Sequence, residues 1–145
     1  MKKPATLYLN TPCLSEYVGV IRLAVSGLAT RMDFTVEEIE DIKIAVSEAC
    51  TNSVQYAYKN NPDGRIDLTC NSYKDELELI RKDTGCGFEV EEIAAKKPGI
   101  TKDKLGLGLG ITFIKSLMDK AEIKSTTGKG TTVKMVKKLP LNKEK

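Results

Sequence analysis

Apolar residues recur at spacings of three and four in three stretches of the chain, which is the pattern of helices that bury one face. The predicted helices span residues 14–32 and 36–59, and a third begins at Ile111. Thr35 precedes the second helix and Glu38 follows three residues later, which predicts a capping box at its start. Shorter stretches alternate between apolar and polar residues and predict strands. These are residues 6–9, 65–70, 76–82, 121–125 and 131–136.

The length and net charge of the chain limit the classes of protein to which it can belong. The 145 residues suffice for one two-layer core, so we expect a single domain over residues 1–145, with residues 136–145 as a frayed basic tail. A net charge of +3 does not favour nucleic acid as a direct partner. No stretch has the length and apolar character needed to span a bilayer, so we expect a cytoplasmic protein that does not bind membranes.

The composition also excludes several chemistries. The chain contains no histidine, which removes imidazole metal sites, Ser-His-Asp triads and phosphohistidine chemistry. Its four cysteines are far apart and form no CxxC pair, so neither a zinc site nor a redox motif is predicted.

One polar pair lies beside the apolar stripe of the second predicted helix. Glu48 and Asn52 are four residues apart and therefore share a helix face. A carboxylate that accepts a proton and an amide oxygen that binds a hard cation form a suitable pair for phosphoryl transfer. The alternative is two solvated surface residues.

Two glycine-rich segments follow. Asp83, Gly85 and Gly87 come directly after a predicted strand, where the bare backbone could approach a ligand and the carboxylate could accept a hydrogen bond; a plain turn is the alternative. Gly106, Gly108 and Gly110 precede the third predicted helix, whose amino-terminal amides would then cradle a phosphate. The alternative there is a flexible linker.

The segment between these two motifs is a predicted lid. Residues 96–105 have no apolar period, contain Pro98 and Gly99, and are rich in lysine. We expect Lys102 or Lys104 to neutralise the outer phosphates of a bound nucleotide. The three motifs and the lid together predict a nucleotide site.

The motifs EACTN (48–52), DTGCG (83–87), GLGLG (106–110) and GTT (130–132) resemble the four nucleotide motifs of the GHKL ATPase and kinase superfamily. Within it, residues 16–32 and 38–59 resemble the family of anti-sigma-factor serine kinases of the RsbW and SpoIIAB type. The resemblance implies an α+β fold, a two-layer sandwich in which helices cover one face of a mixed, mostly antiparallel sheet.

The resemblance also implies roles for single residues. Glu48 would be the general base toward a serine of a partner protein, and Asn52 would bind the Mg²⁺ that accompanies ATP. Asp83 would accept a hydrogen bond from the adenine amino group, with Thr131 nearby. The expected nucleotide-binding set further includes Gly85, Gly87, Lys104, Gly106, Leu107, Gly108, Leu109 and Gly110.

Partners follow from the same resemblance. The family binds an RNA polymerase sigma factor, phosphorylates an anti-anti-sigma protein and works as a homodimer, and Arg22 would belong to the partner-binding surface. Two alternatives stay open: the ATP-binding domain of a histidine-kinase-like protein, and a non-catalytic module that binds ATP. The charged Arg81 and Lys82 directly before Asp83 depart from the family pattern, and they lead us to expect a hydrated strand end.

Overall fold

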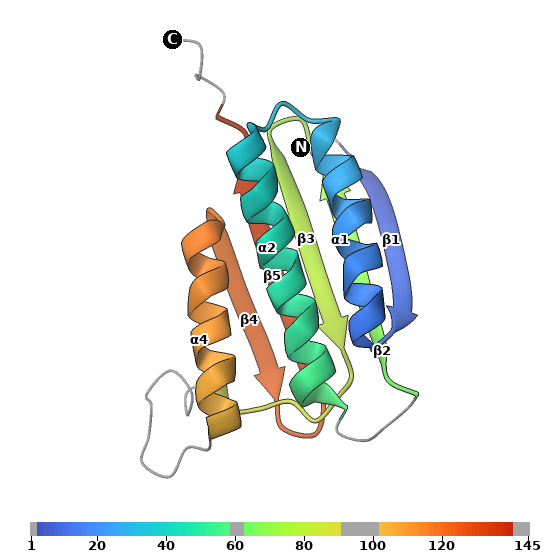
Figure 1. Cartoon of the computed structure of the whole chain (residues 1–145), viewed down its shortest axis with the longest axis vertical. Helices are drawn as coiled ribbons and strands as arrows, with labels where there is room; N and C mark the ends of the chain where they lie inside the picture. Colours follow the sequence, from blue (N-terminus) through green and yellow to red (C-terminus); the bar gives the residue numbers. More distant parts are fainter. Residues whose placement is uncertain (1–2, 59–62, 91–101, 141–145) are drawn as a thin grey trace.

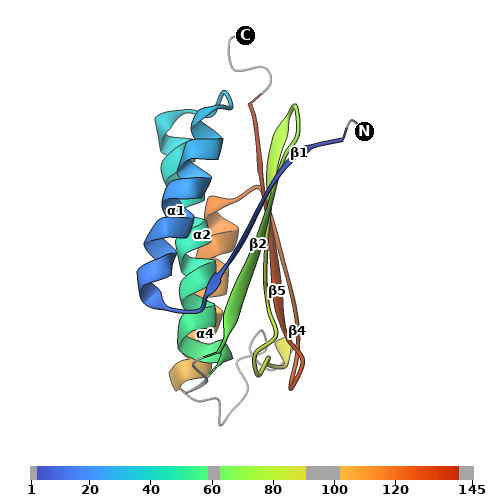
Figure 2. The same ribbon diagram turned by 90° about the vertical axis from the view of Figure 1, so that its right-hand side faces the viewer.

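Five strands form one sheet, and helices cover one of its faces, in the computed structural model of the chain (Figure 1, Figure 2). The structure describes residues 3–58, 63–90 and 102–140. The strands are β1 (Ala5–Pro12), β2 (Arg65–Ser72), β3 (Glu76–Asp83), β4 (Lys120–Thr126) and β5 (Gly130–Lys138). The helices are α1 (Ser15–Thr30), α2 (Val36–Asn52) and α4 (Lys102–Leu117), and a π-helical turn, η1 (Ser53–Ala57), continues α2.

The sheet has the strand order β1-β2-β3-β5-β4, and each neighbouring pair is antiparallel. Strand β3 therefore lies at the centre, between β2 and β5. Helix α2 crosses the middle of the covered face, with α1 on one side and α4 on the other (Figure 1). The predicted α+β sandwich is confirmed; the expected mixed sheet is antiparallel throughout the described part.

Helix α2 supplies the middle of the core because its apolar stripe faces the sheet. Ile42 and Val46 are fully buried and belong to the same apolar cluster as Leu68 of β2 and Leu79 of β3. Burying a side chain of this kind contributes about 1.5–3 kcal/mol. The packing of α2 against the central strands therefore holds the functional face of this helix in a defined orientation.

The start of α2 is closed by the predicted capping box. The Thr35 amide donates to Glu38 Oε1 at 2.8 Å, and the Glu38 amide donates to Thr35 Oγ1 at 3.1 Å. Two of the helix's unpaired first-turn amides are satisfied in this way. The regular helix ends at Asn52, earlier than predicted, because the next five residues wind as the π-helical turn.

Two further boundaries that bear on the site differ from the prediction. Helix α4 begins at Lys102, so residues 102–110, expected as the end of the lid and a glycine loop, are helical. Strand β5 continues to Lys138, so the first residues of the expected tail pair with β3. The rest of the predicted lid, residues 96–101, and the last tail residues, 141–145, lie outside the described residues.

None of the helices in the described ranges combines the length and the apolar character that a membrane span requires.

Candidate functional site

The predicted acid–amide pair lies on the side of α2 that faces α4. Asn52 is buried and Glu48 is half-buried. Gly110 of α4 lies directly against both side chains: a β-carbon at Gly110 would come within 2.8 Å of Glu48 Oε2 and 3.3 Å of Asn52 Oδ1. The missing side chain at Gly110 therefore leaves the space that these two polar groups share.

A π-helical turn follows Asn52 and directs the side chain of Ser53 toward the sheet. Ser53, the first residue of η1, is buried, and its hydroxyl donates to Asp83 Oδ2 at 2.8 Å. Single π turns within α-helices are rare and are frequent at functional sites. Since Ser53 follows Asn52 in the chain, this hydrogen bond connects the Glu48–Asn52 pair to the aspartate at the end of β3.

The Asp83 carboxylate is enclosed by donors. Its side chain has an exposed fraction of 2%. The Oδ1 atom accepts from the amides of Gly85 at 3.0 Å and Thr131 at 3.3 Å. The Oδ2 atom accepts from the Ser53 hydroxyl and the Arg81 guanidinium. A buried carboxylate is tolerated where hydrogen bonds and an opposite charge compensate for its lost hydration, and Asp83 has both.

The loop after Asp83 packs against the end of η1. The Cys86 amide donates to the Ala57 carbonyl at 2.7 Å. A β-carbon at Gly85 would overlap the backbone of Ala57, so only glycine permits this close approach. Gly87 has a φ of 64°, a conformation that favours glycine. The two predicted glycines thus have a structural requirement of their own beside any ligand.

Thr131 lies next to Asp83 because β5 pairs with β3 in a register that places these two residues opposite each other. Its hydroxyl is 2.7 Å from the Ser125 hydroxyl on β4. The predicted proximity of Asp83 and Thr131 is therefore confirmed. The turns that follow β3 and precede β5, the end of α2 and the first turns of α4 all lie at one end of the molecule (Figure 1).

The glycine motif is not the expected loop at a helix amino terminus. Gly106, Gly108 and Gly110 lie within α4, whose amides are engaged in helical hydrogen bonding. The preceding lysines and Leu105 are good helix formers, and they start the helix before the glycines are reached. Leu109 is exposed and Gly110 is buried. The side chains of Lys102, Lys104 and Leu107 lie outside the described part.

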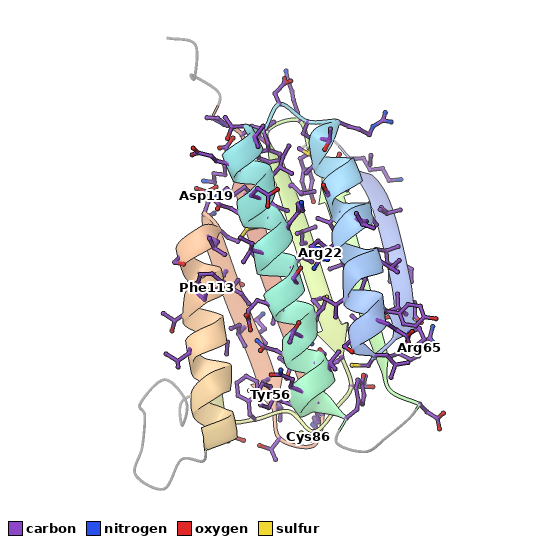
Figure 3. All side chains as sticks on the ribbon, viewed as in Figure 1. Arg22, Tyr56, Arg65, Cys86, Phe113 and Asp119 are labelled. Atoms are coloured by element: carbon purple, nitrogen blue, oxygen red, sulfur yellow. The ribbon has the colours of Figure 1, made fainter. Side chains whose placement is uncertain are left out.

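Arg22 is exposed on α1 and lies beside α2 (Figure 3). It shares a surface depression of about 320 Å³ with Glu48. The remaining lining residues come from α2 and are Glu40, Lys43, Ile44, Ser47 and Thr51. The residue predicted to bind a partner and the residue predicted to be the base therefore open onto one surface.

Three site residues were missed: Ser53, Arg81 and Ser125. Arg81 is 1% exposed, so the expectation of a hydrated strand end is wrong at this residue, although Lys82 is exposed. For Arg81 the sequence does contain a signal. Residues two apart in a strand point to the same face, so Arg81 shares a face with Asp83. Ser53 and Ser125 have no comparable sequence signal.

The arrangement is that of a known class of nucleotide-binding domain. Residues 11–137 match the family model of the histidine kinase-like ATPase domain, which defines the class to which this fold and site belong. The RsbU and RsbW domains of a Mycobacterium tuberculosis protein superpose with a TM-score of 0.68 over 93% of this chain and 32% of that one. Their sequence identity of 17% means that this likeness concerns the fold alone.

Two relatives specify the family further. Serine-protein kinase RsbW of Bacillus subtilis (strain 168) is 42% identical over 136 residues, covering 90% of this chain and 84% of that protein. Serine-protein kinase RsbW of Bacillus pumilus (strain SAFR-032) is 43% identical over 136 residues, covering 89% and 83%. The chain belongs to the RsbW family of serine-protein kinases within the histidine kinase-like ATPase class.

Proposed function

We propose that this protein is an ATP-dependent protein-serine kinase and anti-sigma factor. It sequesters an RNA polymerase sigma factor and phosphorylates an anti-anti-sigma protein on serine. The observation that carries the proposal is the placement of Glu48 and Asn52 of α2 against the bare backbone of Gly110. The Ser53–Asp83 hydrogen bond links this pair to the aspartate at the end of β3. Membership of the RsbW family supports the same conclusion.

Asp83 is the residue suited to recognise adenine. An ionised carboxylate accepts a hydrogen bond from the 6-amino group of adenine and repels the carbonyl oxygen that guanine has at that position. A hydrogen bond to a charged group contributes about 1.5–3 kcal/mol, enough to select ATP over GTP. Thr131 borders the same group through its amide.

Asn52 is the residue suited to the magnesium ion that accompanies ATP. No cluster of three or more acidic, cysteine or histidine side chains within the described ranges forms a metal cage. Mg²⁺ in nucleotide sites is held by one or two protein oxygens together with phosphates and water, and the buried amide of Asn52 fits that requirement. When bound, the ion supplies charge neutralisation on the phosphates.

Glu48 is the general base. Its carboxylate takes the proton of the incoming serine hydroxyl while the serine oxygen attacks the γ-phosphorus and ADP leaves with the bridging oxygen. The Glu48 carboxylate is half-buried beside Gly110, and the depression shared with Arg22 gives the partner's serine an approach to it from the surface.

The partner surface includes Arg22, which lies exposed at that depression. A guanidinium there suits an acidic segment of a sigma factor or of the substrate protein. Lys102 or Lys104 neutralises the outer phosphates, a role that their positions in the first turn of α4 allow. We further propose that the chain forms a single domain, that two chains form a homodimer and that the protein is cytoplasmic.

The test is transfer of labelled γ-phosphate from ATP to a serine of the anti-anti-sigma protein. Glu48→Gln should bind ATP as the unaltered protein does but transfer phosphate about 100-fold to 10,000-fold more slowly, because the proton acceptor is gone. Glu37→Gln makes the same charge change on the exposed first turn of α2 and should leave the rate unchanged.

Two results would contradict the proposal. An unaltered rate in Glu48→Gln would remove Glu48 from catalysis. Absence of transfer by the unaltered protein, with ATP bound, would leave a non-catalytic binding module.

A further inference from the structure

Arg81 occupies a position where the sheet otherwise has apolar side chains. It lies on the helix-covered face of β3, where Leu77 and Leu79 precede it on the same face, and its exposed fraction is 1%. Its neighbours across the sheet are Leu68 of β2 and Val133 of β5, both buried. A guanidinium keeps its charge in such surroundings, so its burial is costly unless a counter-charge is in contact.

The counter-charge is Asp83. The Nη1 group of Arg81 donates to Asp83 Oδ2 and to the Ser53 hydroxyl, and both charged side chains are 2% exposed. The Nε atom of Arg81 has no hydrogen-bond partner among the described residues. The guanidinium therefore contacts the carboxylate through Nη1, and its Nε–H remains without a hydrogen-bond acceptor among the described residues.

Stability alone gives a weak reason for this arrangement. Replacing a buried ion pair by apolar side chains of similar volume is often neutral or stabilising, whereas removing one partner is costly. An apolar residue at position 81 would continue the pattern of Leu77 and Leu79. The feature that the pair adds is a fixed orientation of the Asp83 carboxylate.

We propose that Arg81 is a positioning residue that holds the Asp83 carboxylate, from the core side, in the orientation in which it accepts a hydrogen bond from the 6-amino group of adenine. This inference rests on the proposed function, in which Asp83 recognises adenine. Arg81 and Ser53 hold Oδ2 from the core side, and the amides of Gly85 and Thr131 hold Oδ1 from the loop side. Without the guanidinium, the Asp83 carboxylate would be buried with one donor fewer, and its orientation would be less fixed.

The experiment compares two nucleotides rather than one. Dissociation constants are measured for ATP and for purine riboside 5′-triphosphate, which lacks the 6-amino group, both with magnesium. The unaltered protein should prefer ATP by about tenfold or more, as expected for a hydrogen bond to a charged group. Arg81→Met should weaken ATP binding by about tenfold and leave the analogue unchanged, so that the preference is lost.

Two further variants separate positioning from packing. Leu79→Val removes a methylene from the same face of β3 and should leave the ATP preference intact whatever it does to stability. Arg81→Lys retains the cation without the planar fork and should restore part of the preference. Circular dichroism confirms folding, and Arg81→Gln replaces Arg81→Met, with the same criteria, if the latter does not fold.

The outcomes are distinct. A wild-type preference in Arg81→Met overturns the positioning role, as does an equal loss of affinity for both nucleotides, which indicates packing alone. If the unaltered protein binds ATP and the analogue equally, the adenine-acceptor role of Asp83 fails, and the inference about Arg81 fails with it.

Discussion

Three of the buried polar residues gather at one end of the molecule, around Asp83. Ser53 and Arg81 donate to its carboxylate through their side chains, and Thr131 donates through its backbone amide. A buried polar cluster around one carboxylate favours one arrangement of the elements that meet there, because each misplaced donor would leave a further buried group unpaired. The end of α2, the end of β3 and the start of β5 are thereby held in register around the site.

The cysteines of the core behave as apolar residues. Burial raises the pKa of Cys50 to about 12 and that of Cys70 to about 11, because the charged thiolate is poorly solvated between the layers. The Arg81 cation opposes this effect at Cys50 and lowers its pKa in part. Both groups therefore stay protonated and unreactive near neutral pH.

Alkaline pH should destabilise the protein through Cys50. Its pKa is about 12 in the folded chain against an ordinary value of 9.0, so the stabilising effect is complete below pH 9 and is lost as pH rises from 9 toward 12. We expect a loss of about 1 kcal/mol from this thiol at pH 10. Urea unfolding between pH 8 and 10 measures it, and Cys50→Ala should show a correspondingly shallower decline. Equal slopes would contradict the predicted linkage.

At the scale of elements, α2 and α4 differ in how far sequence determines them. The apolar stripe and the Thr35–Glu38 capping box predicted α2, and both are present. In α4 the glycines indicated a loop, yet the residues around them favour a helix strongly enough to include them. Each interior glycine costs about 1 kcal/mol relative to alanine, so the first half of α4 has low intrinsic stability.

Gly110 has a helical backbone that any residue could adopt, so the reason for glycine there is the close approach of α4 to Glu48 and Asn52 of α2. We expect Gly110→Ala to stabilise α4 by up to about 1 kcal/mol and to slow phosphate transfer about 100-fold, because the new β-carbon at 2.8 Å displaces the Glu48 carboxylate. Thermal unfolding and the serine-transfer assay measure the two effects. Ser116→Ala, on an exposed turn of α4, also raises helix propensity and should leave transfer unchanged. A normal rate in Gly110→Ala would contradict the role given to this space.

The parts of the site that sequence predicted are those with a periodic or motif signal. Glu48 and Asn52 share a helix face by their spacing, and Asp83 ends a strand beside glycines. The contacts of Ser53 and Arg81 depend on a π-helical turn and on the packing of α2 over β3. No local pattern encodes the Ser53 contact, and for Arg81 the strand period gives only the face that it shares with Asp83, not the burial of that face at the strand end.

At the scale of the whole molecule, the topology explains why distant motifs meet. The order β1-β2-β3-β5-β4 places β5 beside β3, which brings Thr131 to Asp83 although they are 48 residues apart. The helix layer covers one face of this sheet and places α4 against α2 (Figure 2). Glu48 borders both the space beside Gly110 of α4 and the depression that it shares with Arg22 of α1.

The most direct test of this convergence is a crystal structure with magnesium and a non-hydrolysable ATP analogue. We expect the 6-amino nitrogen of adenine within hydrogen-bond distance of the Asp83 carboxylate, the Asn52 amide oxygen on the metal, and Glu48 facing the terminal phosphate with an open path to the surface near Arg22. A nucleotide bound elsewhere, or a purine with no contact to Asp83, would contradict the proposed site.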